Sequence, residues 1–326
     1  MFIDIHVHTR SIPGPLRDGK PDYSTPEHLI ERYDAVGVEA AVLLPGVSPE
    51  GSVAPQSNEE ILQVCERFPA RFIPFCNVDP RSVYNSPDAP LDCILQHYKE
   101  RGCKGVGEVT ANLPFDHPMV ENLFKHCQAL GLPLTFHIGP AIGGCYGLYD
   151  EPGLPLLEQA LRKFPALIFL GHSQPFWSEI AVLENPQSRG GYPDGPVSEE
   201  GAVPRLMRQY SNLHGDLSAG SGYNALNRDP DYAARFIDEF QDRLYFGTDI
   251  CAPDTPTPLV GFLLKMRSDG RISEMAFHKI ARENAARLLG MKGTENRKRA
   301  KAQKDLKPRM NADKHRYFRP QRHQRK

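Results

Sequence analysis

Two histidines, His6 and His8, stand one residue apart at the end of a short apolar segment at the N-terminus. Alternate side chains of a β-strand point to the same face, so the two imidazoles face the same way while Val7 turns into the packing. Paired imidazoles are ligands that zinc and other divalent cations favour. Solvated or hydrogen-bonded histidines give the same pattern, so a metal site requires further ligands elsewhere in the chain.

The elements that must position such ligands alternate between short apolar runs and longer helical patterns. Strands are expected at residues 2–5, 39–44, 72–77, 104–108, 132–137, 167–170, 213–217 and 244–246. Helices are expected at residues 26–35, 57–67, 88–101, 118–130, 154–164, 205–209, 231–240, 258–266 and 273–289. Eight strands separated by helices predict an α/β fold, the (β/α)8 TIM barrel, which typically has about 250 residues.

Local signals support several of these boundaries. Ser57 is expected to be a helix N-cap, with Glu60 three residues later completing a capping box. Gly131 follows the helix at residues 118–130 and is a typical helix stop. Residues 186–201 are rich in Gly, Pro and Ser, and we expect them to form an excursion over the site.

Metal-compatible side chains occur at the ends of five of the expected strands. The C-terminal ends of barrel strands meet at one mouth, where active sites lie. Each residue alone also fits a satisfied loop histidine, a turn or helix cap, or a solvated carboxylate. Together they predict one metal site, built from His6 and His8 after the first strand, Glu108 at the fourth, His137 at the fifth, His172 at the sixth and Asp249 at the eighth.

The charges divide the chain of 326 residues into two parts. Residues 291–326 contain 14 of the 39 Lys and Arg residues and 3 of the 40 Asp and Glu residues, so this segment carries +11 and residues 1–290 carry −12. The apolar fraction of 40% is typical of a globular protein with a sizeable core. We therefore expect a barrel at residues 1–290 and a basic C-terminal tail at residues 291–326.

The basic tail has two interpretations. A block of like charge is expected to be a solvated, disordered segment. Alternatively, it contacts nucleic acid or another anionic partner electrostatically, and the barrel is then a binding module rather than an enzyme. Removing residues 291–326 distinguishes the two, because an enzyme keeps its turnover and a tail-driven binder loses its partner. A barrel that has kept the ligands and lost turnover is a third alternative.

Cysteine usage and hydropathy indicate a cytoplasmic protein. The seven cysteines are odd in number and scattered, without a Cys-x-x-Cys motif, which indicates reduced thiols rather than a disulfide framework. No apolar run approaches the roughly 20 residues of a membrane span. The N-terminus lacks the basic and apolar regions of a signal peptide, so none is expected.

The motifs at the strand ends resemble the amidohydrolase superfamily. More narrowly, they are similar to the amidohydrolase-related branch that includes aminocarboxymuconate-semialdehyde decarboxylase. The resemblance covers residues 1 to about 290 and rests on Asp4-Ile-His6-Val-His8, Gly107-Glu108, Phe136-His137, Gly171-His172, Gly-Thr-Asp249 and the closing segment Glu283-Asn284-Ala-Ala-Arg287-Leu-Leu-Gly290. It implies a metal-dependent TIM barrel that usually holds zinc and often forms a homodimer.

The resemblance also implies roles for the ligands. His6 and His8 bind the more buried metal together with Asp249, and His137 is a ligand. In members with one metal, His172 orients or protonates the reacting group. Glu108 departs from the decarboxylases, which generally lack a metal-binding acid on the fourth strand, whereas hydrolases with two metals place a bridging glutamate or carbamylated lysine there.

Glu108 therefore favours hydrolysis of a small-molecule ester, lactone or amide-type bond. A bound metal lowers the pKa of its water from about 15.7 toward 7. Asp249 is expected to accept the proton of the attacking water, with His172 as the second catalytic residue. If Glu108 bridges, His137 and His172 hold a second metal; if it does not, His137 joins the single site and His172 is the electrophilic or acid partner. The cofactor is one or two divalent ions, with zinc expected and manganese or iron as alternatives. The alternative function is metal-dependent decarboxylation of an unsaturated or aromatic carboxylic acid.

Substrate-binding residues are the least determined part of the prediction. Arg10 and Arg17 lie in the loop after the first strand, where an arginine could meet a substrate carboxylate, although solvated loop arginines are commoner. Tyr146 lies in the loop after the fifth strand, and Trp177 follows the sixth. Both aromatic residues are expected at the pocket wall, with packing under a lid as the alternative.

Overall fold

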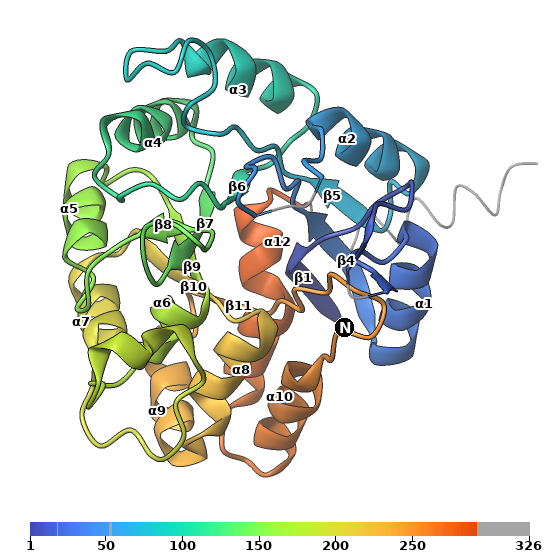
Figure 1. The fold of residues 1–326 in the computed structure, drawn as a ribbon. Helices are drawn as coiled ribbons and strands as arrows, with labels where there is room; N and C mark the ends of the chain where they lie inside the picture. The colour runs from blue at the N-terminus through green and yellow to red at the C-terminus, as the bar shows by residue number, and fades with distance from the viewer. Residues whose placement is uncertain (18, 52–53, 292–326) are drawn as a thin grey trace, which may run out of the picture. The chain divides into compact units, whose positions relative to one another are not determined.

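Parallel strands form a closed ring in this protein, as seen in a computed structural model that describes residues 1–17, 19–51 and 54–291 (Figure 1). The strands run in the orders β1–β4–β5 and β6–β7–β9–β10–β11. Within the described residues, eight strands belong to the ring: β1 (Phe2–Val7), β4 (Val38–Leu43), β5 (Phe72–Pro74), β6 (Val106–Val109), β7 (Leu134–Gly139), β9 (Phe169–His172), β10 (Leu213–Asp216) and β11 (Leu244–Tyr245).

Backbone contacts close the two gaps between these sheets. Cys76, just after β5, forms a parallel bridge with Val106 of β6. On the opposite side, the N–H of Asp249, after β11, donates to the carbonyl oxygen of His6 in β1 at 2.8 Å. The predicted (β/α)8 TIM barrel is therefore confirmed, and each of the eight expected strands overlaps an observed one.

Helices alternate with the strands and surround the ring (Figure 1). The helices of the described residues are α1 (Pro26–Val36), α2 (Asn58–Arg67), α3 (Leu91–Glu100), α4 (Pro118–Leu130), α5 (Pro155–Lys163), α6 (Gln174–Ser178), α7 (Ala202–Gln209), α8 (Ala219–Asn227), α9 (Pro230–Phe240), α10 (Pro258–Ser268), α11 (Glu274–His278) and α12 (Asn284–Leu288), with a short 3₁₀ helix η1 (Pro186–Gly190) and a π-helical turn η2 (Lys279–Glu283).

The helix ends follow the local signals with one difference. Pro118 occupies the first turn of α4, and Gly131 ends that helix with a φ of 64°, a conformation that glycine adopts without steric cost. Ser57 caps α2 by accepting the N–H of Glu60 at 3.1 Å. The Glu60 carboxylate does not complete the box, because it accepts the N–H of Ser11 at 2.9 Å and so joins α2 to the loop after β1.

Three segments differ from the expected elements. The short helix α6 was not expected. Helix α8 was not expected either, because its sequence AGSGYNALN contains two glycines and only weak helical periodicity. The helix expected at residues 273–289 is divided into α11 and α12 by the π-helical turn η2. The segment between residues 186 and 201 is largely irregular, as expected, apart from η1.

An aromatic cluster packs between the barrel and the helices on one side. Phe136 of β7 makes edge contacts with Phe115 and Phe176, with ring centroids 5.1 and 5.8 Å apart. Phe124 of α4 contacts Phe169 of β9 in the same way at 5.1 Å. All of these rings are fully buried, so the strands that carry His137 and His172 are held by a rigid apolar layer.

The described chain forms one compact unit, Met1–Leu289. All seven cysteines are free, as the sequence predicted. None of the described helices is long and apolar enough to cross a membrane. The basic tail predicted at residues 291–326 lies, apart from Met291, outside the described residues.

Candidate metal centre

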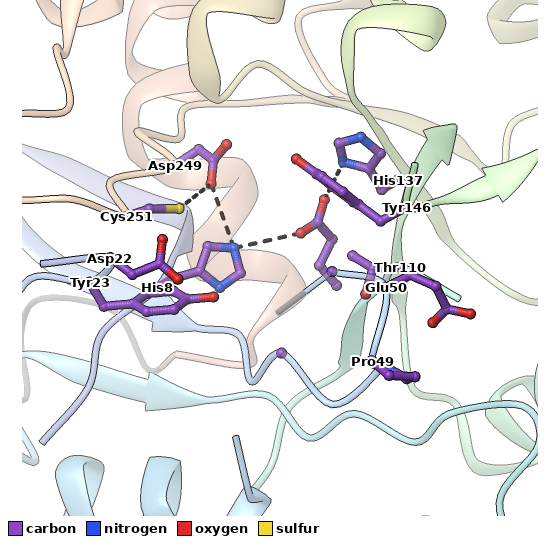
Figure 2. A pocket seen from close by; sticks show the side chains of 13 residues that line it. His8, Asp22, Tyr23, Pro49, Glu50, Thr110, His137, Tyr146, Asp249 and Cys251 are labelled. Carbon is purple, nitrogen blue, oxygen red and sulfur yellow. Dashed lines mark hydrogen bonds and ion pairs between the residues drawn. The ribbon is translucent and has the colours of Figure 1, made fainter. Parts of the chain in front are cut away.

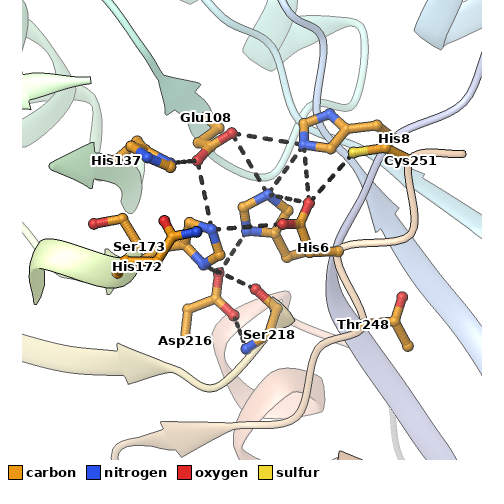
Figure 3. A network of polar contacts seen from close by, with 12 residues as sticks. His6, His8, Glu108, His137, His172, Ser173, Asp216, Ser218, Thr248 and Cys251 are labelled. Carbon is orange, nitrogen blue, oxygen red and sulfur yellow. Dashed lines mark hydrogen bonds and ion pairs between the residues drawn. The ribbon is translucent and has the colours of Figure 1, made fainter. Parts of the chain in front are cut away.

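Five of the six predicted ligands converge on one place at the C-terminal ends of the strands (Figure 3), and Asp249 lies within 3.6 Å of two of them. The six residues come from five different strands or from the loops that follow them. Five of them are at most 7% exposed, and the side chain of Asp249 is 22% exposed, so the cluster is buried with Asp249 at its open side. The set is His6, His8, Glu108, His137, His172 and Asp249.

Two carboxylate oxygens lie close to the facing imidazole nitrogens of His6 and His8. The Nε2 atoms of His6 and His8 lie 3.1 Å apart. The Oε2 atom of Glu108 lies 3.7 and 3.6 Å from these nitrogens, and the Oδ1 atom of Asp249 lies 3.6 and 3.5 Å from them. Zinc bound at about 2.1 Å requires ligand atoms about 3.4 Å apart, so the donors have the spacing of a metal site.

The hydrogen bonds of the two histidines determine which nitrogen carries the proton. Nδ1 of His6 donates to Oδ2 of Asp216 at 2.6 Å, and Nδ1 of His8 donates to the carbonyl oxygen of Leu44 at 2.8 Å. In the neutral form of each imidazole the Nε2 atom therefore carries a lone pair, and the two Nε2 atoms face each other across 3.1 Å. A cation between them removes the repulsion, which means that the residues present fit a divalent metal.

Electrostatics support the same conclusion. Burial disfavours a charged imidazole at His6, but the carboxylates of Asp216 and Asp249 outweigh this effect and raise the pKa of His6 well above its ordinary value. His172 differs, because burial and the nearby His6 lower the pKa of His172 to about 4. The carboxylates thus favour positive charge at His6, carried by a proton or by a metal bound at Nε2, while the His172 imidazole is neutral, as a metal ligand must be.

A second set of donors shares the two carboxylates. The Oε1 atom of Glu108 lies 2.7 Å from Nδ1 of His137 and 3.7 Å from Nε2 of His172. The Oδ2 atom of Asp249 lies 3.7 Å from the same Nε2 atom of His172. Glu108 and Asp249 thus present one oxygen to each set, which is the arrangement of a carboxylate that bridges two ions.

Sequence reasoning missed the residue that orients His6. Asp216 is 1% exposed and ends strand β10, the seventh strand of the barrel, so the rule that selected the other strand ends also applies to it. Ser218, two residues later, contacts Nδ1 of His172 with its hydroxyl at 3.0 Å. These outer contacts fix the ring orientations of two candidate ligands.

Asp4, within β1, has a similar supporting role. Its buried carboxylate accepts the N–H of His6 and the N–H of Thr248, each at 3.0 Å, and the hydroxyl of Tyr33 at 2.7 Å. Asp249 has a φ of 51°, in the left-handed region that few non-glycine residues adopt. The contacts of Asp4 with both β1 and Thr248 hold Asp249 in this strained conformation.

A cavity of about 300 Å³ opens above the cluster (Figure 2). The ring of Tyr146 lies against His137 with the centroids 4.4 Å apart, so this tyrosine is at the pocket wall. The lining comprises His8, Asp22, Tyr23, Gly46, Pro49, Glu50, Gly51, Glu108, Thr110, His137, Tyr146, Asp249 and Cys251.

The other expected substrate-binding residues lie elsewhere. Trp177 is 1% exposed and packs against Phe176, while its indole N–H donates to the carbonyl oxygen of Asp216 at 2.7 Å. Arg10 is directed to the carbonyl oxygen of Ala54. Neither is among the residues that line the pocket, and the side chain of Arg17 lies outside the described part of the structure. The irregular segment 186–201 also contributes no lining residue.

Replacing Asp216 by asparagine is expected to weaken metal binding by about 10- to 100-fold, because His6 loses the carboxylate that fixes its tautomer and raises its basicity. Titration with a fluorescent zinc chelator at equilibrium measures this change. Asp238→Asn, on the outer helix α9, is the matched control. An unchanged affinity in Asp216→Asn would show that Asp216 does not act through His6.

Comparison with known proteins gives the same family as the sequence motifs. The profile of the amidohydrolase family matches residues 3–291. No curated protein gives a significant match. Solved structures with a similar fold include a TIM-barrel protein from Bordetella bronchiseptica, which is 18% identical with a TM-score of 0.59, the match covering 89% of this chain and 98% of that chain.

Two further structures with this fold come from proteins with stated activities. A probable 2-pyrone-4,6-dicarboxylic acid hydrolase from Acinetobacter baumannii is 13% identical, with a TM-score of 0.54 and coverage of 89% of this chain and 99% of that chain. A 5-carboxyvanillate decarboxylase from Novosphingobium aromaticivorans, in complex with manganese, is 18% identical, with a TM-score of 0.54 and coverage of 81% and 79%. At these identities the likeness shows the fold alone.

Proposed function

This chain belongs to the amidohydrolase family, and we propose that it is a metal-dependent hydrolase that splits an ester, lactone or amide-type bond of a small molecule. The observation that carries this proposal is the facing pair of Nε2 atoms of His6 and His8, 3.1 Å apart, with Glu108 and Asp249 oxygens within 3.7 Å. A divalent ion held there supplies an activated water and polarises the scissile carbonyl group.

The residues around the ion divide the remaining tasks. Asp249 is the most exposed of the ligands and lines the pocket, so its carboxylate can take the proton of the attacking water and return it to the leaving group. His172 stays neutral, and its Nδ1 is held by Ser218, so its Nε2 is directed toward Asp249 and Glu108. Burial of these groups strengthens their electrostatic effect on the reacting atoms.

Glu108 supports hydrolysis over decarboxylation. Its two oxygens face different histidine pairs, so Glu108 would be able to help hold two ions, which would supply activation of both a substrate and a water. The alternative function is decarboxylation of an unsaturated or aromatic carboxylic acid, and one contact favours it. Nδ1 of His137 donates to Glu108 at 2.7 Å, and with this hydrogen bond in place the site holds a single ion. The imidazole-rich set favours zinc, with manganese or iron as alternatives.

The reaction class is tested by incubating zinc-loaded and manganese-loaded protein with two panels of compounds. One panel holds 4-nitrophenyl esters, lactones and anilides, and the other holds hydroxybenzoic and unsaturated carboxylic acids. We expect release of nitrophenol, acid or amine in the first panel and no release of carbon dioxide in the second. Carbon dioxide release without hydrolysis would overturn the hydrolase proposal in favour of the alternative.

Metal content is expected to depend on Glu108. We expect two equivalents of metal per chain in the wild type and one or none in Glu108→Ala, because the bridging oxygens are lost. Elemental analysis of protein purified without chelator or added metal measures this. Glu274→Ala, an exposed acid on α11, is the control. One equivalent in both proteins would instead establish a single-ion site that does not need Glu108.

A further inference from the structure

The segment at residues 140–147, which follows strand β7, is held at three points by one side chain. Nδ2 of Asn112 donates to the carbonyl oxygens of Ala141 and Gly147, each at 3.0 Å. Oδ1 of the same amide accepts the N–H of Gly143 at 2.5 Å. Asn112 therefore joins the beginning, the middle and the end of the segment to the chain that follows strand β6.

The last two residues of this segment contact the candidate ligand His137. The ring of Tyr146 lies against the imidazole, with the centroids 4.4 Å apart, and Figure 2 shows both side chains at the wall of the cavity. A Cβ atom on Gly147 would lie 2.7 Å from Cδ2 of His137, so the backbone approaches the ring as closely as only a glycine permits. The N–H of Gly147 also donates to the carbonyl oxygen of Thr110 at 2.8 Å.

These contacts bear on the direction in which the imidazole points. Strand β7 fixes the Cα–Cβ bond of His137, but the χ2 torsion of a histidine is broad and leaves the ring orientation open. A half-turn about χ2 exchanges the positions of Nδ1 and Cδ2. Tyr146 on the face of the ring and Gly147 at Cδ2 confine His137 to one orientation.

The confined orientation is the one that the metal centre uses. Nδ1 of His137 lies 2.7 Å from Oε1 of Glu108. The half-turn would place a carbon atom against this carboxylate and break the hydrogen bond. Glu108, His137 and His172 have ligand atoms within 4.8 Å of one another, so the ring orientation also decides whether His137 joins the other two in holding a second ion.

We propose that Asn112 is a positioning residue of the metal centre. By holding the segment 140–147, it keeps Tyr146 and Gly147 against His137 and so keeps Nδ1 turned toward Glu108. This inference rests on the proposed function, in which His137 contributes to the second ion. Outer contacts of this kind typically change metal affinity by about 10- to 100-fold.

Hydrogen exchange tests the first step of the proposal. Asn112→Ala removes all three hydrogen bonds to the segment 140–147, so amide exchange of this segment is expected to become at least about tenfold faster. Asn112→Asp keeps an acceptor for the N–H of Gly143 and loses both donors, so a smaller change in the same direction is expected. Asn227→Ala, an exposed asparagine at the end of α8, is the matched control and leaves the exchange unchanged.

The second step is tested on the imidazole itself, in the full chain freed of metal by a chelator. With ¹⁵N-labelled histidine, the buried Nδ1 proton of His137 is expected to give a downfield, slowly exchanging resonance. His137→Gln removes this proton and identifies the resonance. Asn112→Ala and Tyr146→Ala are each expected to broaden or abolish it, whereas Asn227→Ala keeps it.

Zinc binding gives a readout of the consequence for the metal centre. Calorimetric titration of the metal-free chain is expected to show the second equivalent bound about tenfold more weakly in Asn112→Ala and in Tyr146→Ala. The first equivalent is expected to be unchanged, because the segment 140–147 contacts His137 and not His6 or His8 in the hydrogen bonds and ring contacts of the described residues. In the double variant the loss is expected to be smaller than the product of the two single losses, because both residues act on the same ring.

The outcomes separate this inference from the proposed function. Unchanged exchange of the segment in Asn112→Ala, or an unchanged His137 resonance despite faster exchange, would overturn the positioning role. Absence of the resonance in the wild type would also overturn it, because His137 would then not be held toward Glu108. A wild type that binds a single equivalent of zinc would count against the two-ion hydrolase, while the resonance still decides the role of Asn112.

Discussion

Asp249→Asn is expected to lower kcat by about 10²- to 10⁴-fold on the best substrate of the ester and lactone panel, with the barrel still folded. General-base catalysis contributes about 10²- to 10⁴-fold, and asparagine cannot accept the proton of the attacking water. Asparagine keeps an oxygen at the position that lies 3.6 Å from Nε2 of His6, so part of the metal affinity remains. Steady-state kinetics with metal in excess separate the loss of turnover from the loss of metal.

The control is Asp254→Asn in the same loop. Asp254 pairs with Lys20 at the surface, its side chain is 63% exposed, and it does not line the pocket. We expect this variant to retain the kcat and metal content of the wild type. Full activity in metal-saturated Asp249→Asn would contradict the mechanism, because the proton of the water would then be taken by another group.

The barrel could be predicted because its signals are local. Each strand is an apolar run of limited length between turn residues, and all six residues of β1 and of β7 are buried. The ligands His137 and His172 could then be predicted without knowledge of contacts, because the C-terminal ends of barrel strands meet at one mouth. His6 and His172 are 166 positions apart in the sequence, yet both lie at the ends of barrel strands, and their ring centroids are 4.4 Å apart.

The supporting residues could not be assigned in this way, because their roles depend on packing. Trp177 carries the same aromatic signal as Tyr146, yet it lies in the core since α6 turns it onto Phe236 and the carbonyl of Asp216. Glu60 satisfies the sequence pattern of a capping box, but Ser11 competes successfully for its carboxylate. A sequence pattern gives the groups available at a position, whereas the partner that each group takes is decided by the tertiary structure.

The buried pair of His6 and Asp216 joins the metal site to the stability of the barrel. Asp216 is 1% exposed, and burial alone raises the pKa of its carboxyl, but the charge and hydrogen bond of His6 outweigh burial and keep that pKa below its usual value. Removing one partner of a buried pair leaves an uncompensated charge, which costs about 3–5 kcal/mol. Replacing His6 removes the partner of Asp216 and a metal ligand together. A single His6 variant therefore combines a loss of stability with a loss of metal binding.

His6→Ala is therefore expected to lower metal affinity by more than about 10³-fold, to abolish activity and to destabilise the metal-free protein by about 3 kcal/mol. Urea unfolding in the presence of a chelator measures the stability term without the contribution of bound metal. In the double variant His6→Ala/Asp216→Asn the uncompensated carboxylate is absent, so most of the stability is expected to return while metal binding stays lost. His278→Ala, an exposed histidine on α11, controls for the loss of an imidazole.

Two results would contradict this account of His6. Metal binding at wild-type affinity in His6→Ala would contradict the assigned ligand set. A double variant as unstable as His6→Ala would show that the buried Asp216 charge is not the cause of the destabilisation.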